Sequence, residues 1–237
     1  MICDNETGQC LITPGADTKG ALPEREKNSL VTVHYVGDPM CSWCWGIANS
    51  VRSLAQLCQQ RGFQFVLTNG GLRAGGGDKW NAAFRNFLRH EWQQINLVTG
   101  QPFSYSLLEL EFFNYDTEPA CRAVVSASLI RPESKLHFFH ETQKKFYTES
   151  ADPKLPSFYQ SICEESGIDF ADFKKVFESR AALLETYNEF RQAREYGVNA
   201  FPSILVEKSG VMQKVITGYS SEEEILRQVL ETEARMK

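Results

Sequence analysis

The sequence lacks any apolar run that approaches the roughly 20 residues needed to cross a bilayer. It also lacks a basic run, and its formal net charge is -5, which argues against nucleic acid as the main partner. The first residues, MICDNETGQCLITPG, contain neither a basic segment nor an apolar segment, so they do not form a secretory signal. We therefore expect a cytoplasmic protein that binds neither membranes nor nucleic acid.

The composition is that of an ordinary globular protein, with 42% hydrophobic and 23% charged residues. A length of 237 residues is enough for one large core or two modest ones. Seven cysteines are an odd number, so at least one of them stays outside any internal disulfide. That count also suits a reducing compartment.

The clearest chemical signal lies between Val31 and Ile47, in the stretch VTVHYVGDPMCSWCWGI. Its first six residues predict a buried strand, which the turn residues GDP then end. Cys41 and Cys44 follow at once, and helical apolar spacing begins at Trp45. The two cysteines are therefore predicted to lie where a strand passes into a helix.

This placement favours thiol chemistry. The first amides of a helix are unpaired and carry partial positive charge, so a sulfur there ionises more easily. Because the thiolate attacks in disulfide exchange, Cys41 is the candidate nucleophile and Cys44, one turn further on, the candidate resolving thiol. The spacing also suits half of a zinc site, but no second CxxC or close Cys/His pair follows. We therefore favour a redox pair and expect no metal and no separate cofactor.

The chain divides into an arm and two structural parts. Residues 1–29 show no periodicity, which predicts an irregular N-terminal arm. Residues 30–73 and 180–237 alternate between strand and helix patterns, which predicts an α/β domain built from two segments. Residues 74–179 show helical spacing with five apolar stripes, which predicts an inserted all-helical domain that caps the edge of the sheet.

In the α/β part, the spacing predicts one helix from the cysteines to about Gln60, followed by a strand parallel to the first. Two later runs joined by a Ser-Gly turn predict an antiparallel hairpin. Ser221 and Glu224 form a capping box that starts the last helix. The predicted strands are residues 31–36, 63–68, 203–207 and 212–217.

This order of elements resembles that of the DsbA-like thiol-disulfide oxidoreductases, and the segment DPMCSWCWG is most similar to their FrnE-like branch. The resemblance implies a thioredoxin-like fold with a large inserted all-helical domain. It also implies a reversible disulfide between Cys41 and Cys44, and a cis Phe201–Pro202 bond that faces them. The backbone of Phe201 would then pair with an extended peptide substrate. Without the resemblance, a trans proline at a loop-to-strand junction is the ordinary interpretation.

The sequence departs from this family in one place. Many relatives keep a buried carboxylate six residues before the first cysteine as a proton acceptor, and here that position is Tyr35. His34 would serve as the proton relay if its ring faced Cys44, although a strand histidine is more often simply packed. Trp43 and Trp45 are candidates for contact with unfolded substrate, because exposed aromatic side chains beside a nucleophile suit that role.

The arm contains a second cysteine pair, Cys3 and Cys10, in CDNETGQC. Two unpaired thiols, a local disulfide, an accessory redox pair and metal binding are all compatible with this spacing.

Three functions follow from these observations. The first is thiol-disulfide exchange with protein or peptide partners, with glutathione or a partner thiol as electron donor. The second is a glutathione-dependent isomerase or transferase of the same fold, although such enzymes typically keep a serine where Cys41 stands. The third is a peptide-binding or zinc-holding module without enzymatic activity.

Overall fold

The computed structural model describes residues 2–3, 10–11 and 30–236 of the chain. Two short strands, β1 (Ile2–Cys3) and β2 (Cys10–Leu11), pair in antiparallel fashion with Cys3 opposite Cys10. The side chains of these two cysteines and most of the predicted arm lie outside the described residues. An accessory redox pair of Cys3 and Cys10 therefore stays a prediction.

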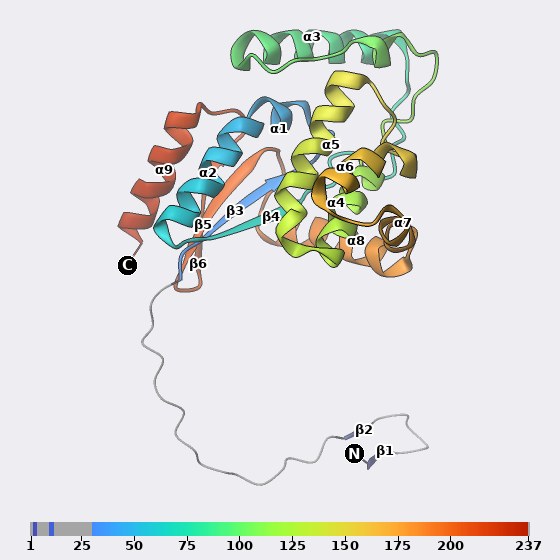
Figure 1. Ribbon diagram of the computed structural model, residues 1–237. Helices are drawn as coiled ribbons and strands as arrows, with labels where there is room; N and C mark the ends of the chain where they lie inside the picture. The colour runs from blue at the N-terminus through green and yellow to red at the C-terminus, as the bar shows by residue number, and fades with distance from the viewer. Residues whose placement is uncertain (1, 4–9, 12–29, 237) are drawn as a thin grey trace, which may run out of the picture.

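A four-stranded sheet forms the centre of the α/β part (Figure 1). Its central strand β3 pairs in parallel with β4 and antiparallel with β5, which forms a hairpin with β6. Every residue of β3 is buried, because this strand has a neighbour on both sides and helices over both faces. The predicted parallel pair and hairpin are confirmed. In the order of the sheet, the strands are β4 (Gln64–Asn69), β3 (Thr32–Gly37), β5 (Ser203–Lys208) and β6 (Val211–Thr217).

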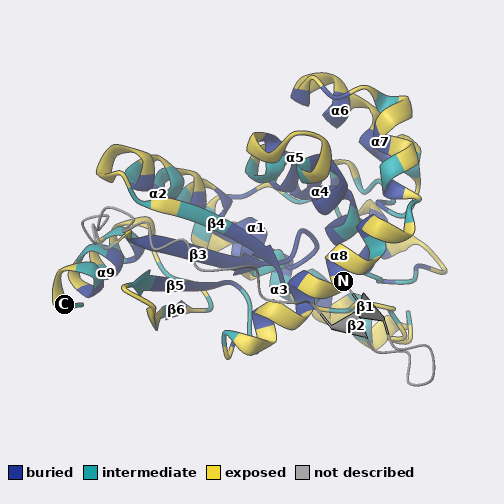
Figure 2. Ribbon diagram, turned by 90° about the horizontal axis from the view of Figure 1, so that it is seen from below, coloured by how far each residue is buried: buried dark blue, intermediate teal, exposed yellow. Residues whose placement is uncertain are grey.

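Helices cover both faces of this sheet. On one face, α2 (Ala48–Arg61) and α9 (Glu222–Arg235) pack side by side. On the other face, α8 (Arg180–Glu195) packs against β4, and its Ala193 shares a small core with β3 and β5. Figure 2 shows the consequence: β3, most of β5 and the inner sides of the helices are buried, whereas the edge strand β6 and the outer sides of the helices are largely exposed.

The predicted single helix after the cysteines is two helices, α1 (Ser42–Gly46) and α2, separated at Ile47. The break follows Gly46, where helix α3 approaches closely. A Cβ at this position would lie 2.9 Å from a methyl group of Ile95 on α3. Glycine permits this contact but favours helix continuation poorly, which explains why the helix turns here.

The insertion contains the five helices that the apolar stripes predict, joined by three short 3₁₀ turns. One hydrophobic core runs from β3 through α5 to α7, so the insertion and the α/β part share their interior. The thioredoxin-like fold with a helical insertion is thus confirmed, while the boundaries 73/74 and 179/180 stay a prediction. In chain order the helices are α3 (Ala82–Thr99), α4 (Glu118–Ile130), α5 (Lys135–Glu149), α6 (Gln160–Ser166) and α7 (Phe170–Phe177), and the 3₁₀ turns are η1 (Ser106–Glu109), η2 (Pro132–Ser134) and η3 (Pro156–Tyr159).

Helix α3 lies across the top of the molecule in Figure 1, where it packs against α1. Within the part of the chain that the structure describes, no helix combines the length and the apolar character that a bilayer crossing requires.

A buried polar cluster ties the insertion to the sheet. Glu189 of α8 is 8% exposed and accepts hydrogen bonds from the backbone N–H (2.8 Å) and the side-chain amide (2.7 Å) of Asn69 at the end of β4. Glu189 also pairs with Lys135 of α5, which donates to the Leu67 carbonyl oxygen at 2.8 Å. Three elements far apart in the sequence therefore meet at one carboxylate.

We expect Glu189→Ala to lower the free energy of unfolding by about 3 kcal/mol, because it removes the carboxylate that neutralises the partly buried Lys135 ammonium group and accepts from the buried Asn69 amide. Urea denaturation measures this change. Glu178→Ala is the matched control, since its pair with Lys174 is 3.9 Å long and both side chains are more than half exposed. The control should change stability by less than about 0.5 kcal/mol. Equal effects of the two substitutions would contradict this account of the cluster.

Candidate active site

Cys41 lies at the position that the sequence predicts, as the N-terminal cap residue of α1. Its backbone N–H donates to the Asp38 carbonyl oxygen at 3.0 Å, which closes the turn between β3 and the helix. Its side chain makes no capping hydrogen bond, and its Sγ lies 3.8 Å from the carbonyl oxygen of Phe201. Cys41 is 5% exposed, so its sulfur lies at the edge of the core next to the Phe201 loop.

Cys44 lies one turn further along and is completely buried. Burial raises the pKa of the Cys44 thiol well above its usual value, and the neighbouring Cys41 thiol raises it further. The backbone of Asp38 and the hydroxyl of Tyr35 act in the opposite direction, because both lie close enough to stabilise a thiolate. The two sulfurs therefore differ in burial: Cys41 lies at the edge of the core, as a nucleophile should, and Cys44 lies behind it, as a resolving thiol should.

Tyr35 occupies the position at which relatives keep a carboxylate, and it faces Cys44. A Cβ on Gly37 would lie 2.6 Å from the Tyr35 hydroxyl oxygen and 3.2 Å from the Cys44 Sγ, so both atoms flank that glycine. Burial raises the pKa of Tyr35 well above its usual value, and the nearby Cys44 adds to this. The Tyr35 hydroxyl is buried without a hydrogen bond of standard geometry to any described residue.

Asp38 is a turn former, as predicted, and it also anchors the site to the insertion. Its Oδ1 accepts a hydrogen bond from the Met40 N–H at 2.8 Å, and its Oδ2 accepts one from the Leu72 N–H at 2.7 Å. The thiol of Cys121 on α4 donates to Oδ2 at 3.5 Å. Burial raises the pKa of the Asp38 carboxyl, which the two amides partly oppose. The carboxylate thus holds together segments that are 34 and 83 residues away from it in sequence.

The Phe201–Pro202 peptide bond is cis, as the resemblance implies. Pro202 is buried and Phe201 is half-buried, and the loop faces Cys41 across the site. The Phe201 ring lies directly over Gly70, where a Cβ would come within 2.1 Å of the ring. Gly70 is therefore required for this loop to approach β4. No local pattern in the sequence indicates this role.

His34 does not face Cys44, so the condition for its role as a proton relay is not met. Side chains alternate along a strand, and Tyr35 takes the side of β3 that faces the cysteines. His34 points to the other side, where its Nε2 lies 2.9 Å from a carboxylate oxygen of Glu207 and its ring packs edge-on against Tyr196. It is a packed, hydrogen-bonded histidine.

The two tryptophans beside the cysteines have different surroundings. Trp45 is 3% exposed, donates from its indole N–H to the Pro102 carbonyl oxygen at 3.0 Å and stacks on Tyr147. The prediction that Trp45 contacts substrate is therefore wrong, because α5 and the segment at Pro102 cover it. Trp43 is partly exposed, its indole N–H lies 3.3 Å from Glu91, and its ring lies 5.4 Å from that of Tyr219.

Sequence reasoning missed two residues that shape this site. Tyr115 donates a hydrogen bond to the Met40 carbonyl oxygen at 2.8 Å, and Cys121 reaches Asp38 from α4. Both come from the insertion, and no local pattern marks either of them. Across residues 30–236 no three histidine, cysteine or acidic side chains lie close enough together to hold a metal ion.

A helix-capping cysteine, a buried second cysteine and a cis-proline loop on one face of a four-stranded sheet define a thioredoxin-fold protein with a CxxC site. The sequence matches the model of the DSBA-like thioredoxin domain over residues 32–229. The chain therefore belongs to the DSBA-like thioredoxin domain family.

Solved structures similar to this chain include a candidate protein disulfide isomerase from Nitrosomonas europaea, with 33% identity and a TM-score of 0.77 over 87% of this chain and 98% of that one. Another is the cytosolic disulfide reductase DsbM from Pseudomonas aeruginosa, with 22% identity and a TM-score of 0.66 over 87% and 100% of the two chains. A 2-hydroxychromene-2-carboxylate isomerase is 16% identical with a TM-score of 0.57 over 86% and 94%. The last two likenesses show the fold alone. No curated protein sequence matches the chain.

The burial of the thiols generates a labelling prediction. In the reduced native protein, Cys41 should react with iodoacetamide before the four other cysteines of residues 30–236, because it alone of these five retains exposed surface. Burial raises the pKa of Cys58 to about 11 and that of Cys163 to about 12, and it raises those of Cys44 and Cys121 as well. Peptide mass spectrometry should find these four labelled only after unfolding. Labelling of native Cys44 as fast as Cys41 would contradict the geometry.

Proposed function

We propose that this protein is a thiol-disulfide oxidoreductase that exchanges disulfides with protein or peptide clients through Cys41 and Cys44. The observation that carries this proposal is the pairing of a cysteine at the edge of the core with a fully buried one behind it, beside the cis Phe201–Pro202 loop. The family assignment and the similarity to a candidate disulfide isomerase support it. The FrnE-like branch within this family stays a prediction.

In the reducing direction, the Cys41 thiolate attacks one sulfur of a client disulfide. A Cys41–client disulfide forms, the client bond breaks, and the released client sulfur leaves as a thiolate that takes up a proton. Cys44 then loses its proton and attacks Cys41. The Cys41–Cys44 bond forms, the second client sulfur leaves, and two electrons have passed from the protein to the client. The oxidising direction is the reverse of these steps.

The geometry supports a binding mode for an extended client. The Phe201 carbonyl lies beside Cys41, where a client backbone N–H would find an acceptor. Trp43 and the 42% exposed Tyr219 lie next to each other at the same edge and would contact client side chains.

Glutathione or a partner thiol would return the protein to its reduced form. A solved structure of DsbM holds glutathione, and that protein is described as a cytosolic disulfide reductase. By analogy of fold we propose the same electron source and a cytoplasmic location. The reduction potential of the Cys41–Cys44 pair, measured against glutathione, decides between reduction and oxidation of clients, since about 30 mV corresponds to 1.4 kcal/mol.

Two other functions fit the structure less well. A 2-hydroxychromene-2-carboxylate isomerase is among the similar structures, but a glutathione-dependent isomerase would have no use for a buried second cysteine. A zinc-holding module would need two more ligands beside Cys41 and Cys44, and the described residues bring none together there.

An insulin-reduction assay with dithiothreitol or glutathione tests the proposal. We expect turnover by the wild type and none by Cys41→Ser. Mixed with insulin in the absence of added thiol, reduced Cys44→Ser should accumulate a client adduct, because Cys44 is the thiol of the site that would expel a client bound to Cys41. Cys58→Ser is the matched control, since Cys58 is a core thiol of α2 with no part in the site. Wild-type turnover that survives Cys41→Ser would reject the proposed function.

A further inference from the structure

The burial of Cys44 poses a problem of proton transfer. This thiol must lose its proton before it can attack Cys41, yet it has no exposed surface through which water could remove that proton. Burial also opposes ionisation of the thiol. If the proposed function holds, the proton must leave through a neighbouring group. The identity of the groups that carry this proton therefore rests on the proposed function.

Tyr35 is the neighbour that can pass a proton on. Its hydroxyl lies beside the Cys44 sulfur above Gly37, and it has no other hydrogen-bond partner of standard geometry among the described residues. Asp38 reaches Cys44 only through its backbone, and its carboxylate oxygens are occupied by the N–H groups of Met40 and Leu72 and by the thiol of Cys121. A hydroxyl can accept one proton while it donates its own.

A small cavity adjoins Tyr35, between β3, α2 and α5. Its volume is about 10 Å³, close to the space that one water molecule needs. The polar side chains among its lining residues are those of Tyr35, Arg52, His140 and Gln143. The side-chain nitrogen of Gln143 is buried and has no hydrogen-bond partner among the described residues. Size and polar lining both suit one bound water.

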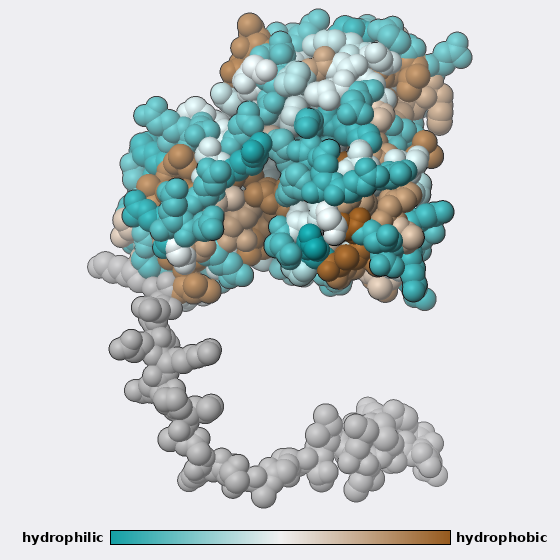
Figure 3. Space-filling model, in the orientation of Figure 1, coloured by the Kyte–Doolittle hydropathy of each residue, from teal (hydrophilic) through white to brown (hydrophobic). Residues whose placement is uncertain are grey.

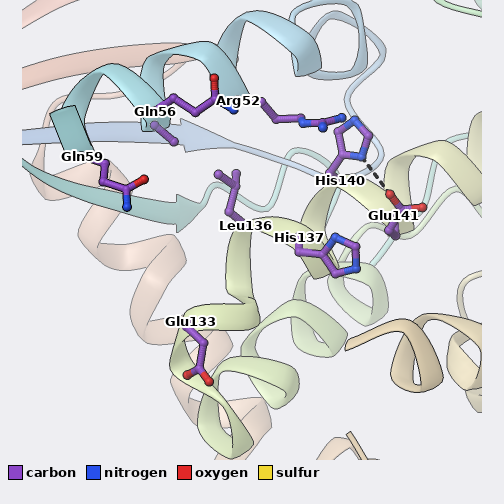
Figure 4. A pocket seen from close by; sticks show the side chains of 9 residues that line it. Arg52, Gln56, Gln59, Glu133, Leu136, His137, His140 and Glu141 are labelled. Carbon is purple, nitrogen blue, oxygen red and sulfur yellow. Dashed lines mark hydrogen bonds and ion pairs between the residues drawn. The ribbon is translucent and has the colours of Figure 1, made fainter. Parts of the chain in front are cut away.

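His140 links this cavity to the surface. It lines the small cavity and also a surface pocket of about 440 Å³ between α2 and α5. Figure 3 shows this face of the molecule hollowed between the two helices, with apolar side chains in the hollow. Figure 4 shows Arg52 reaching from α2 toward His140, and the 3.2 Å contact between His140 Nδ1 and Glu141.

We propose that Tyr35, one water in the small cavity and His140 form the path by which the proton of Cys44 reaches solvent. The Cys44 thiol gives its proton to the Tyr35 hydroxyl as that hydroxyl gives its own to the water. The water passes a proton to the imidazole of His140, and the imidazolium releases it into the surface pocket. Cys44 is left as the thiolate that attacks Cys41, so protons and electrons balance.

The surroundings of His140 favour its neutral form, which is the form that can take up a proton. Glu141 and Lys144 lie on its own helix, Arg52 faces it from α2, and the uncharged ring of Trp45 lies 5.8 Å away on α1. Burial lowers the pKa of His140, with Arg52 and Lys144 in the same direction and Glu141 opposing them. His140 is therefore neutral near pH 7 and able to take a proton. Its ability to accept is lost as the pH falls through this pKa.

The path is tested with His140→Gln and the matched control His137→Gln. His137 lies one turn away on α5 and lines the same surface pocket, but it does not line the small cavity. The probe is 4,4′-dithiodipyridine, mixed in stopped flow with reduced protein that carries Cys3→Ser and Cys10→Ser. The first thiopyridone released reports attack by Cys41, and the second reports attack by Cys44.

We expect His140→Gln to slow the second release by about 10- to 100-fold at pH 7.5 while the first release is unchanged. His137→Gln should alter neither phase. The ratio of the wild-type to the His140→Gln rate should fall toward one as the pH falls through the lowered pKa of His140, because the protonated ring no longer accepts a proton. A role limited to folding would not produce this pH dependence.

Tyr35→Phe keeps the ring and removes only a hydroxyl without a standard hydrogen bond, so the protein should fold. It should slow the second release as His140→Gln does. Equal second-phase rates in His140→Gln and His137→Gln, or a normal second phase in Tyr35→Phe, would overturn the path. Absence of the first phase in the wild type would instead reject the proposed function, so the two failures are distinguishable.

Discussion

The burial of the second cysteine is the constraint on which the site depends. A thiol without exposed surface is protected from oxidants and competing disulfides, but it is also hard to ionise. The groups around Cys44 both protect the thiol and favour its ionisation. The Asp38 backbone and the Tyr35 hydroxyl favour the thiolate from two sides, while the surrounding core keeps other reactants away.

The helical insertion creates much of that core. Trp45 is held by the Pro102 carbonyl and by Tyr147, and the turn before Cys41 is held by Tyr115 and Cys121. These contacts come from segments that follow the second strand of the sheet. The insertion therefore forms part of the cysteine site and also shields it from solvent. It also shapes the pocket between α2 and α5, into which His140 points.

Tyr35 distinguishes this chain from relatives that keep a buried carboxylate at that position. A carboxylate there could accept a proton outright, whereas a phenol whose pKa burial raises can only relay one. The fully buried Asp38 lies nearby, but its carboxylate is committed to the turn and to the insertion. The acceptor must then lie elsewhere, and the small cavity beside Tyr35 leads to His140 on α5.

The sequence by itself determined most of the elements and the place of the cysteine pair among them. The strand before the cysteines, the hairpin, the five helices of the insertion and the place of Cys41 at a helix start all follow from local patterns. The cis state of Phe201–Pro202 came from the resemblance, since few X-Pro bonds are cis.

Only the tertiary structure decided which side chains meet the cysteines. Strand alternation places Tyr35 beside Cys44 and directs His34 toward Glu207. The packing of the insertion buries Trp45. Asp38 meets Cys121 across 83 residues of sequence. Local patterns arise from the hydrogen bonding and apolar periodicity of neighbouring residues, whereas the surroundings of a sulfur are set by segments that become neighbours only when the core closes.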